Sequence, residues 1–420
     1  MKLKNKPRGT VDIFPPRSAI YQKIQQISSN ILKKNNYQLV IFPTYEYESL
    51  FTNSLGSTTS IIYKEMFTFK DRSNRELALR PEGTASVVRL VCENKLIKEG
   101  YPLKIYYWAN MFRYERPQKG RHREFWQLGV ELINAKGSFA DYQILKLVSD
   151  ILQELGIKKF NFCLNYLGNK DTKERYKSLL EEFIKNKTHN LCNDCQRRHL
   201  SNILRIVDCW KCKQKLSYPP YEKAWNNQDK DNVKEINDIL NKVNFPYQYD
   251  FNLVRGLDYY TGIVFEVNIE EEKALLGGGR YDNLYQEIGD VNSPAIGFAI
   301  GIDRLVDYLE TLPANLELLK NSNIIDIFFF LSVPDFYFEV LNWKKKLEKF
   351  SLIVEYNLEI KKLKNIVKII NHYQPKLMII LGEKELKNDK IFIKDCQKEL
   401  EFFIDKEKLI KWIANYFQKN

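Results

Sequence analysis

The stretch FRYERPQKGRHREFWQLGVE, residues 112–131, decides the fold class of this chain. Residues 104–114 and 124–134 have the pattern of two strands, and the polar residues 115–123 between them predict a loop. Strands joined by a short loop pair as a hairpin, so the pairing is expected to be antiparallel. The sequence therefore predicts a core built on an antiparallel sheet.

The hairpin also places reactive side chains on shared faces. Because side chains alternate along a strand, one face of the second strand carries an aromatic ring, an amide, a gap and a carboxylate. These residues are Phe125, Gln127, Gly129 and Glu131, and on the first strand Arg113 and Glu115 share a face. Such a set suits a cleft for a nucleotide and a small molecule. Taken alone, an arginine-rich hairpin is more commonly a solvated surface.

Helices and strands continue on both sides of the hairpin. Apolar residues at helical spacing predict a helix over residues 18–35, and residues 38–42 predict a strand. Further strands are expected at residues 263–269 and 295–299. Together these elements predict an α+β core over residues 1–320.

Two changes in character predict further modules. Residues 167–246 are polar, rich in lysine and asparagine, and carry four of the seven cysteines, which predicts an inserted, mainly helical module. Over residues 324–420 strands alternate with helices, which predicts a small α/β domain with a largely parallel sheet. The linker is expected at residues 311–323. The expected strands are 324–331, 352–356 and 376–381, the helices 336–350, 361–373 and 406–417, and the hairpin 390–404.

The charge balance suits a polyanionic partner. The 420 residues include 65 lysines and arginines against 53 acidic residues, a net charge of +12, which favours nucleic acid through phosphate contacts. Codon bias is an equally good explanation of a lysine- and asparagine-rich composition. We expect no membrane span, because apolar runs are short, and no secretory or transit segment is visible. With an odd number of cysteines, a reducing cytoplasm is the expected location.

The order Phe-Arg-x-Glu, a basic loop and Arg-x-x-x-Phe resembles motif 2 of the class II aminoacyl-tRNA synthetases. The fuller string, with Gln127 and Glu131, is similar to the histidine-specific branch. The resemblance implies that Arg113 binds the α-phosphate of ATP and that the ring of Phe125 stacks on adenine. It also implies that Arg116 and Gln118 face the acceptor end of tRNA. A planar, permanently charged arginine is suited to phosphate.

Further segments resemble the motifs of this family, in the family's order. Pro7–Asp12 resembles its N-terminal signature, Asn36–Pro43 its dimer-forming motif 1, and Leu79–Ala85 the loop that holds the amino group of the substrate. Leu253–Gly262 and Gly277–Asp282 resemble the two histidine-specific motifs, and Gly297–Arg304 resembles motif 3. Within motif 3, Asp303 departs from the usual glutamate, which puts a role for that carboxylate in doubt but not the role of Arg304.

The resemblance implies a set of residues for each substrate. The residues for histidine are Glu82, Gly83, Thr84, Gln127, Glu131, Arg255, Tyr259, Tyr260 and Tyr281. Those for ATP are Arg113, Arg121, Phe125 and Arg304. Glu82 would pair with the ammonium group, and Glu131 and Tyr260 with the two imidazole nitrogens. Arg113 and Arg255 are the expected catalytic residues, which neutralise charge together with Mg²⁺. The plain alternative for the tyrosines is core packing, and for the glycines of 277–279 a turn.

Cys192, Cys195, Cys209 and Cys212 form two Cys-x2-Cys pairs separated by thirteen residues. This spacing is typical of a tetrahedral zinc site. Any zinc here is expected to be structural, because the family does not need it for catalysis. The alternative is four reduced thiols in a small insertion.

The resemblance as a whole implies a histidine–tRNA ligase. Such an enzyme activates histidine with ATP and transfers it to tRNA(His), acts as a homodimer, and recognises the anticodon through its C-terminal α/β domain. Three alternatives are a synthetase-like regulatory subunit of histidine biosynthesis, a class II synthetase for another amino acid, and an RNA-binding protein without activity. The segment from Arg255 to Tyr260 and the C-terminal domain argue against a regulatory subunit. The same segment argues against a synthetase for another amino acid. An RNA-binding protein without activity would leave the ordered Glu82, Gln127 and Glu131 unexplained.

Overall fold

The computed structural model describes residues 5–55, 59, 61–118, 120–269, 274–313 and 325–419. The chain divides into two compact units, Met1–Thr311 and Leu312–Asn420. Residues 314–324, which include most of the expected linker, lie outside the described residues. No helix in the described parts of the chain has the length and apolar character needed to cross a bilayer.

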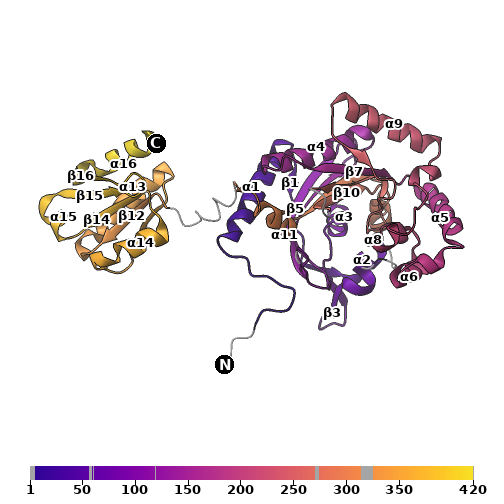
Figure 1. Ribbon diagram of the computed structural model, residues 1–420, viewed down its shortest axis with the longest axis horizontal. Helices are drawn as coiled ribbons and strands as arrows, with labels where there is room; N and C mark the ends of the chain where they lie inside the picture. The colour runs from indigo at the N-terminus through magenta and orange to yellow at the C-terminus, as the bar shows by residue number, and fades with distance from the viewer. Residues whose placement is uncertain are drawn as a thin grey trace. The chain divides into compact units, whose positions relative to one another are not determined.

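An eight-stranded sheet forms the core of the first unit (Figure 1). In spatial order its strands are β1 (Gln38–Leu39), β5 (Leu103–Phe112), β6 (Glu124–Ile133), β11 (Ala295–Gly301), β10 (Leu276–Arg280), β9 (Thr261–Asn268), β7 (Asn161–Tyr166) and β8 (Gln248–Tyr249). The predicted hairpin is confirmed: β5 and β6 pair antiparallel over ten residues each. All pairs are antiparallel except the short outer pairs β1–β5 and β7–β8.

Two groups of helices accompany this sheet. The first consists of α1 (Arg17–Lys34), α4 (Ser138–Glu154) and α11 (Ile302–Leu309), and the second of α2 (Glu48–Leu55), α3 (Thr84–Glu93) and α10 (Leu284–Gly289). A small sheet of β2 (Tyr45–Tyr47), β4 (Glu76–Leu79) and β3 (Phe67–Lys70) adjoins α2. The predicted N-terminal helix is confirmed as α1, which buries Ile20, Tyr21, Ile24 and Leu32. The strand expected at residues 38–42 is shorter, because only Gln38 and Leu39 pair with β5.

The polar stretch around residues 167–246 is mainly helical. It contains α5 (Lys170–Ile184), α6 (Asn193–Ser201), α7 (Leu204–Val207), α8 (Trp210–Lys213) and α9 (Asn227–Lys242). Figure 1 shows these helices gathered on the side of the sheet where β7 lies. Helix α9 begins with a capping box, in which Asn226 and Asp229 each accept the backbone N–H of the other residue.

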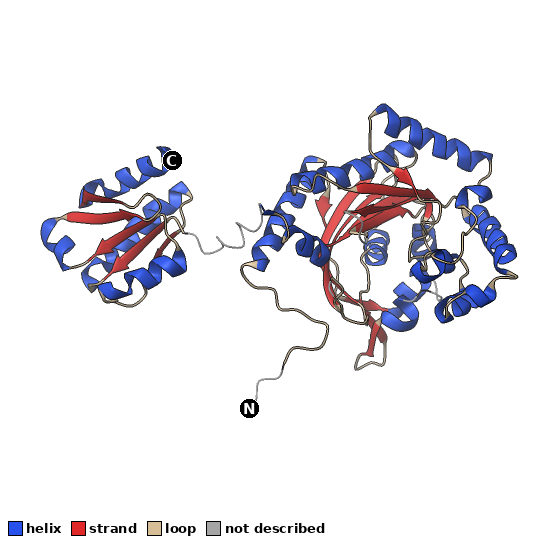
Figure 2. Cartoon of the chain, in the orientation of Figure 1, coloured by secondary structure: helices blue, strands red, loops and turns tan. Residues whose placement is uncertain are grey.

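The second unit is a five-stranded sheet with helices on both faces (Figure 2). Its order is β13 (Val354–Tyr356), β12 (Ile327–Leu331), β14 (Leu377–Leu381), β15 (Lys390–Asp395) and β16 (Leu400–Asp405). The first three strands are parallel and the last two form an antiparallel hairpin. The helices are α13 (Tyr337–Leu347), α14 (Ile366–Tyr373), α15 (Glu383–Asn388) and α16 (Leu409–Lys419).

Strand β12 explains the continuous apolar run at the start of this unit. Ile327, Phe329 and Leu331 face one apolar cluster, whereas Phe328 and Phe330 face the other. A strand that is buried on both faces cannot alternate apolar with polar residues. The α+β core with a C-terminal α/β unit agrees with the predicted fold class.

Candidate active site

A cavity of about 470 Å³ opens over the central strands of the large sheet, a volume typical of small-molecule sites. Strands β6, β9, β10 and β11, the loop after β4, the loop before β9 and the start of α11 supply its walls. Of the residues predicted for histidine, Glu82, Thr84, Gln127, Glu131, Arg255, Tyr259, Tyr260 and Tyr281 line it. Of those predicted for ATP, Arg113, Arg121, Phe125 and Arg304 line it. Gly83, Arg116, Gln118 and the four clustered cysteines do not.

At one end of the cavity lies the buried carboxyl group of Glu131. Its two oxygens accept hydrogen bonds from the hydroxyl groups of Tyr281 at 2.5 Å and of Thr84 at 2.9 Å. Burial raises the pKa of Glu131 to about 8, although these two hydrogen bonds act in the opposite direction. In the free cavity this carboxyl group is therefore mostly protonated near neutral pH, and a positive group or an N–H donor beside it would favour its ionised form.

Glu82 is a second buried carboxyl at the same end. Its oxygens accept the backbone N–H groups of Thr84 at 2.7 Å and Ala85 at 2.8 Å, so Glu82 caps the start of α3. Burial raises the pKa of Glu82, while the backbone hydrogen bonds oppose the shift. Two carboxyl groups with raised pKa values at one end of a cavity favour a ligand with positive charge.

Tyr107 fills the gap that Gly129 leaves on the face of β6. The two residues are direct partners across the β5–β6 hairpin. A Cβ atom at Gly129 would lie 2.0 Å from the ring of Tyr107, and one at Gly83 would lie 2.3 Å from it. Gly83 therefore makes room for Tyr107 rather than lining the cavity.

The glycines at 277–279 lie in strand β10, not in a turn. A Cβ atom at Gly277 would lie 2.3 Å from the guanidinium carbon of Arg255, so the absence of a side chain makes room for that arginine. Gly297 on β11 has the same relation to Glu131: its Cβ would lie 1.8 Å from a carboxylate oxygen. Both glycines are required by side chains that line the cavity.

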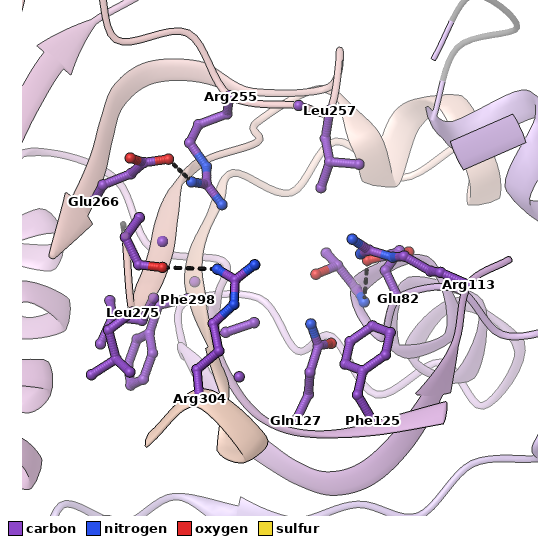
Figure 3. Close-up of a pocket in the computed structure, with 18 of the residues that line it drawn as sticks. Glu82, Arg113, Phe125, Gln127, Arg255, Leu257, Glu266, Leu275, Phe298 and Arg304 are labelled. Atoms are coloured by element: carbon purple, nitrogen blue, oxygen red, sulfur yellow. Dashed lines mark hydrogen bonds and ion pairs between the residues drawn. The ribbon is translucent and has the colours of Figure 1, made fainter. Parts of the chain in front are cut away.

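Arginines also line the cavity, and Figure 3 shows one of them, Arg113, next to Glu82. Arg113 lies 5.3 Å from the ring centre of Phe125, and its Nε donates to the backbone oxygen of Pro81 at 2.8 Å. Figure 3 shows Arg113 and Arg304 on opposite sides of the open space, with Gln127 between them. The side-chain oxygen of Gln127 is buried and has no hydrogen-bond partner among the described residues. It is therefore available to a ligand.

Arg255 reaches the cavity from the loop before β9 and pairs with Glu266 on that strand (Figure 3). Burial acts to lower the pKa of Arg255, but the charge and hydrogen bond of Glu266, together with the nearby Tyr260 and Asp208, outweigh it, so the pKa is raised. The Nε of Arg255 has no partner among the described residues. Arg255 thus keeps donor capacity for an anion.

Asp303 and Arg304 begin α11 but have different surroundings. One carboxylate oxygen of Asp303 accepts the backbone N–H of Trp126 at 2.7 Å, and the other accepts the hydroxyl of Tyr21 at 3.0 Å. Asp303 therefore joins α1, β6 and α11. Arg304 donates to the backbone oxygens of Ala274 at 3.0 Å and Gly120 at 3.2 Å, and its guanidinium faces the cavity.

The loop after β5 carries the exposed Arg116 and Gln118. It is closed by backbone hydrogen bonds in both directions between Gln118 and Arg121. The N-terminal segment that resembles the family signature contacts the end of this loop, because the backbone oxygen of Gly9 accepts the N–H of Arg123 at 2.7 Å. Gly9 has a φ of +89°, and a Cβ there would lie 2.8 Å from the side chain of Arg123.

The four predicted cysteines come together away from the cavity. Their sulfur atoms lie within 4.8 Å of one another, and those of Cys192 and Cys209 are 3.8 Å apart. Zn–S bonds of about 2.3 Å in a tetrahedron place sulfurs about 3.8 Å apart, so the cluster has the size of a zinc site. Although burial opposes it, hydrogen bonds from the backbone of Cys195 and from the other thiols lower the pKa of Cys192 to about 7.

Sequence reasoning missed several residues that line the cavity, among them Tyr107, Asp208 and Glu266. The pairing of Tyr107 with Gly129 follows from the hairpin register and could have been found from it. Glu266 lies on a strand that was predicted, at a position that faces Arg255. Nothing in the sequence indicated Asp208, which comes from the inserted module.

Comparisons with known proteins agree with these motifs. The family model for histidyl-tRNA synthetase matches residues 9–305. The histidine–tRNA ligase of Mycoplasma capricolum is 38% identical over 93% of this chain and 95% of its own length. The Bacillus subtilis ligase is 35% identical over 96% of both. The crystal structure of apo S. aureus histidyl-tRNA synthetase matches with a TM-score of 0.80 at 29% identity and covers 98% of this chain and 100% of that one. The chain belongs to the histidyl-tRNA synthetase family.

Proposed function

We propose that this chain is a histidine–tRNA ligase, which forms histidyl-adenylate and pyrophosphate from histidine and ATP and then transfers histidine to the 3′ end of tRNA(His). The single observation that supports it best is that one cavity is lined both by buried carboxyl groups and by arginines. The carboxyl groups are those of Glu82 and Glu131, and the arginines include Arg113, Arg255 and Arg304. A site that takes an amino acid with a positive group and a nucleotide with negative phosphates needs both kinds of side chain.

Histidine would bind beside these two carboxyl groups. Glu82, with Thr84 beside it, accepts hydrogen bonds from the ammonium group, and Glu131 accepts one from an imidazole N–H. Each carboxylate oxygen accepts more than one hydrogen bond, so Tyr281 and Thr84 leave Glu131 able to do so. Tyr260 pairs with the other imidazole nitrogen, and Tyr259 and Gln127 complete the wall.

ATP would bind between the arginines that line the cavity. Its adenine stacks on Phe125 under Arg304, while Arg113 and Arg121 contact the phosphates. Glu115, Asp208 and Glu266 line the cavity as oxygen donors, which is the ligand type that Mg²⁺ prefers. Magnesium bound with ATP neutralises phosphate charge.

The reaction needs no covalent nucleophile from the protein. The carboxylate of histidine attacks the α-phosphorus in line, and the bond to pyrophosphate breaks. The 3′-terminal ribose hydroxyl of tRNA then attacks the carbonyl of the adenylate, and AMP leaves. Arg113 and Arg255 stabilise the negative charge on the α-phosphate as these bonds change.

The other parts of the chain have their own proposed partners. Exposed Arg116 and Gln118 contact the acceptor end of tRNA, and residues 324–420 contact the anticodon. Residues 167–246 form the module inserted into the catalytic domain, residues 1–320. Because its substrates are ATP and tRNA, the enzyme is expected to act in the cytoplasm.

A second copy of the chain is proposed to cover the edge of the large sheet. Strand β1 is an edge strand, and Leu39, Ile41, Tyr45 and Tyr47 on and after it are more than half exposed. Exposed apolar side chains gathered in this way near a sheet edge are normally covered. Sedimentation of Ile41→Asp against the unaltered chain tests this homodimer: the variant should sediment as a monomer, and an unchanged dimer would contradict the assignment.

The four-cysteine cluster is proposed to bind one structural zinc ion. Cys192, Cys195, Cys209 and Cys212 have the number, chemistry and spacing that zinc requires. Purified protein should contain one zinc per chain by elemental analysis. Cys209→Ser should lose it, whereas Cys396→Ser, outside the cluster, should not. If the unaltered protein contained no zinc after refolding in the presence of zinc, the proposal would be contradicted.

ATP–pyrophosphate exchange with each amino acid in turn tests the proposed activity. Exchange with histidine alone supports it. Exchange with another amino acid would identify a sister enzyme, and no exchange would point to a regulatory subunit. Arg255→Ala should reduce adenylate formation far more than tRNA binding, and an equal loss of both would exclude its assigned role.

A further inference from the structure

The two cysteine pairs close a segment of chain that runs beside the active site. Cys195 lies in the first turn of α6 and Cys209 directly precedes α8, so that residues 196–208 lie between the two pairs. The contact between the sulfurs of Cys192 and Cys209 joins the two ends of this cysteine-closed segment. A metal ion held by all four thiolates would cross-link these ends and restrict the freedom of the segment between them.

Two side chains of the cysteine-closed segment contact the loop that carries Arg255. Arg205 donates from Nη2 to the backbone oxygen of Gly256, and its Nε lies 3.9 Å from a carboxylate oxygen of Asp258. Asn202 donates to both carboxylate oxygens of Asp258, at 3.1 and 3.0 Å. Arg205 is only 9% exposed, so these contacts are largely shielded from water.

This loop depends on such contacts for its position. Residues 250–260 contain no helix or strand, and their neighbours β8 and β9 fix only the two ends. On the active-site side, Arg255 is held by Glu266 and packs over Gly277. On the other side, the residues directly after Arg255 are held by Arg205 and Asn202, and also by Lys173, which donates to the backbone oxygen of Asp258 at 3.1 Å.

The same segment also reaches the active-site cavity. Asp208, directly before Cys209, lines the cavity together with Arg255 and Glu266. A shift of the segment would therefore move one wall of the cavity and the support of Arg255 together. Misplacement of a charged group by about 1 Å is enough to reduce a rate strongly.

We propose that Arg205 and Asn202 are positioning residues for histidine activation, which hold the Arg255–Asp258 loop in place, and that the four-cysteine cluster holds these two residues. The inference rests on the proposed function, because activation is the step that Arg255 serves. The inserted module would then contribute to the formation of histidyl-adenylate, although none of its cysteines lines the cavity.

The first test compares three variants in histidine-dependent ATP–pyrophosphate exchange. Arg205→Ala should raise the KM for histidine about tenfold and lower kcat, Arg205→Lys should recover most of the loss because it keeps a charged donor, and Arg197→Ala should behave as the unaltered chain. Arg197 lies in the same segment, is exposed, and within the described residues its side chain pairs with Asp194 alone. A lowered melting temperature of Arg205→Ala with unchanged kinetic constants would overturn the proposal.

The second test asks whether the cluster and Arg205 act together. Cys209→Ser should change the kinetic constants in the same direction, and the double variant with Arg205→Ala should be little worse than either single variant. If the fold-changes of the two single variants multiplied in the double variant, a shared role would be contradicted.

A readout independent of activity separates this inference from the proposed function. Amide hydrogen exchange of residues 255–260 should quicken in Arg205→Ala and in Cys209→Ser, but not in Arg197→Ala. If the unaltered chain failed to activate histidine, the proposed function would fall, while this exchange measurement would still decide whether the segment positions the loop. Unchanged protection of residues 255–260 would exclude it.

Discussion

Replacing Glu131 by glutamine should stabilise the fold and impair histidine activation at the same time. Glu131 is 1% exposed, and among the described residues its carboxyl group accepts hydrogen bonds from two hydroxyl groups, those of Tyr281 and Thr84. Glutamine keeps the shape and part of this hydrogen bonding but cannot ionise. The variant therefore separates the effect of the carboxyl group on the stability of the fold from its effect on histidine binding.

The magnitude follows from the pKa of Glu131. A rise from 4.5 to about 8 corresponds to about 5 kcal/mol for ionising this group in the folded state. The folded protein holds the proton more tightly than the unfolded chain, so stability falls as pH rises above about 4.5 and levels off above about 8. Near neutral pH, Glu131→Gln should gain about 3 kcal/mol, because ionisation in the folded state is incomplete there.

The same replacement removes a charged hydrogen bond to the substrate. Hydrogen bonds to charged groups contribute about 2 kcal/mol, which corresponds to a roughly thirtyfold rise in the KM for histidine. The assays are thermal unfolding across pH and ATP–pyrophosphate exchange at varied histidine. The melting temperature should rise by several degrees near neutral pH, and this gain should disappear towards pH 4.

The matched control is Glu124→Gln. Glu124 lies on the same strand, accepts a hydrogen bond from Asn110, and does not line the cavity. It should show neither the pH-dependent gain in stability nor the rise in KM. A Glu131→Gln variant that melts at a lower temperature near neutral pH, or that binds histidine as well as the unaltered chain, would refute the reasoning.

Three further replacements test the surroundings of this group. Tyr281→Phe removes a hydrogen bond that lowers the pKa of Glu131, so the acid limb of the pH profile for histidine exchange should move to higher pH; a shift to lower pH would be inconsistent with that contact. Gly297→Ala should cost about 1–3 kcal/mol of stability and abolish most exchange, because its Cβ would overlap a carboxylate oxygen of Glu131; normal kinetic constants would show that the carboxyl has room to move. Asp303→Ala should lower the free energy of unfolding by about 1–3 kcal/mol, since the N–H of Trp126 loses its acceptor, with little change in the KM for ATP; a large rise in that KM at unchanged stability would instead assign Asp303 to the nucleotide.

The hairpin could be predicted because its information is local. Alternation along one strand was enough to place Phe125, Gln127 and Glu131 on one face, and all three line the cavity. Arg255 and Tyr260 came from resemblance alone, because nothing local shows that a loop more than a hundred residues away in sequence returns to this strand.

What the sequence left open depends on contacts between distant segments. For the glycines at 277–279 the plain alternative to a family motif was a turn, whereas they form a strand that makes room for Arg255. Asp303 was marked only as a departure from a pattern, and its role as a link between Tyr21 and Trp126 needed coordinates. Asp208 reaches the cavity from an inserted module whose packing no periodicity describes.

Aminoacylation of total tRNA with each labelled amino acid tests the central claim most directly. Histidine alone should become attached, and only to tRNAs that read histidine codons. Arg255→Ala should abolish the attachment while tRNA binding persists. Attachment of a different amino acid, or exchange of histidine into ATP without any transfer to tRNA, would contradict the account.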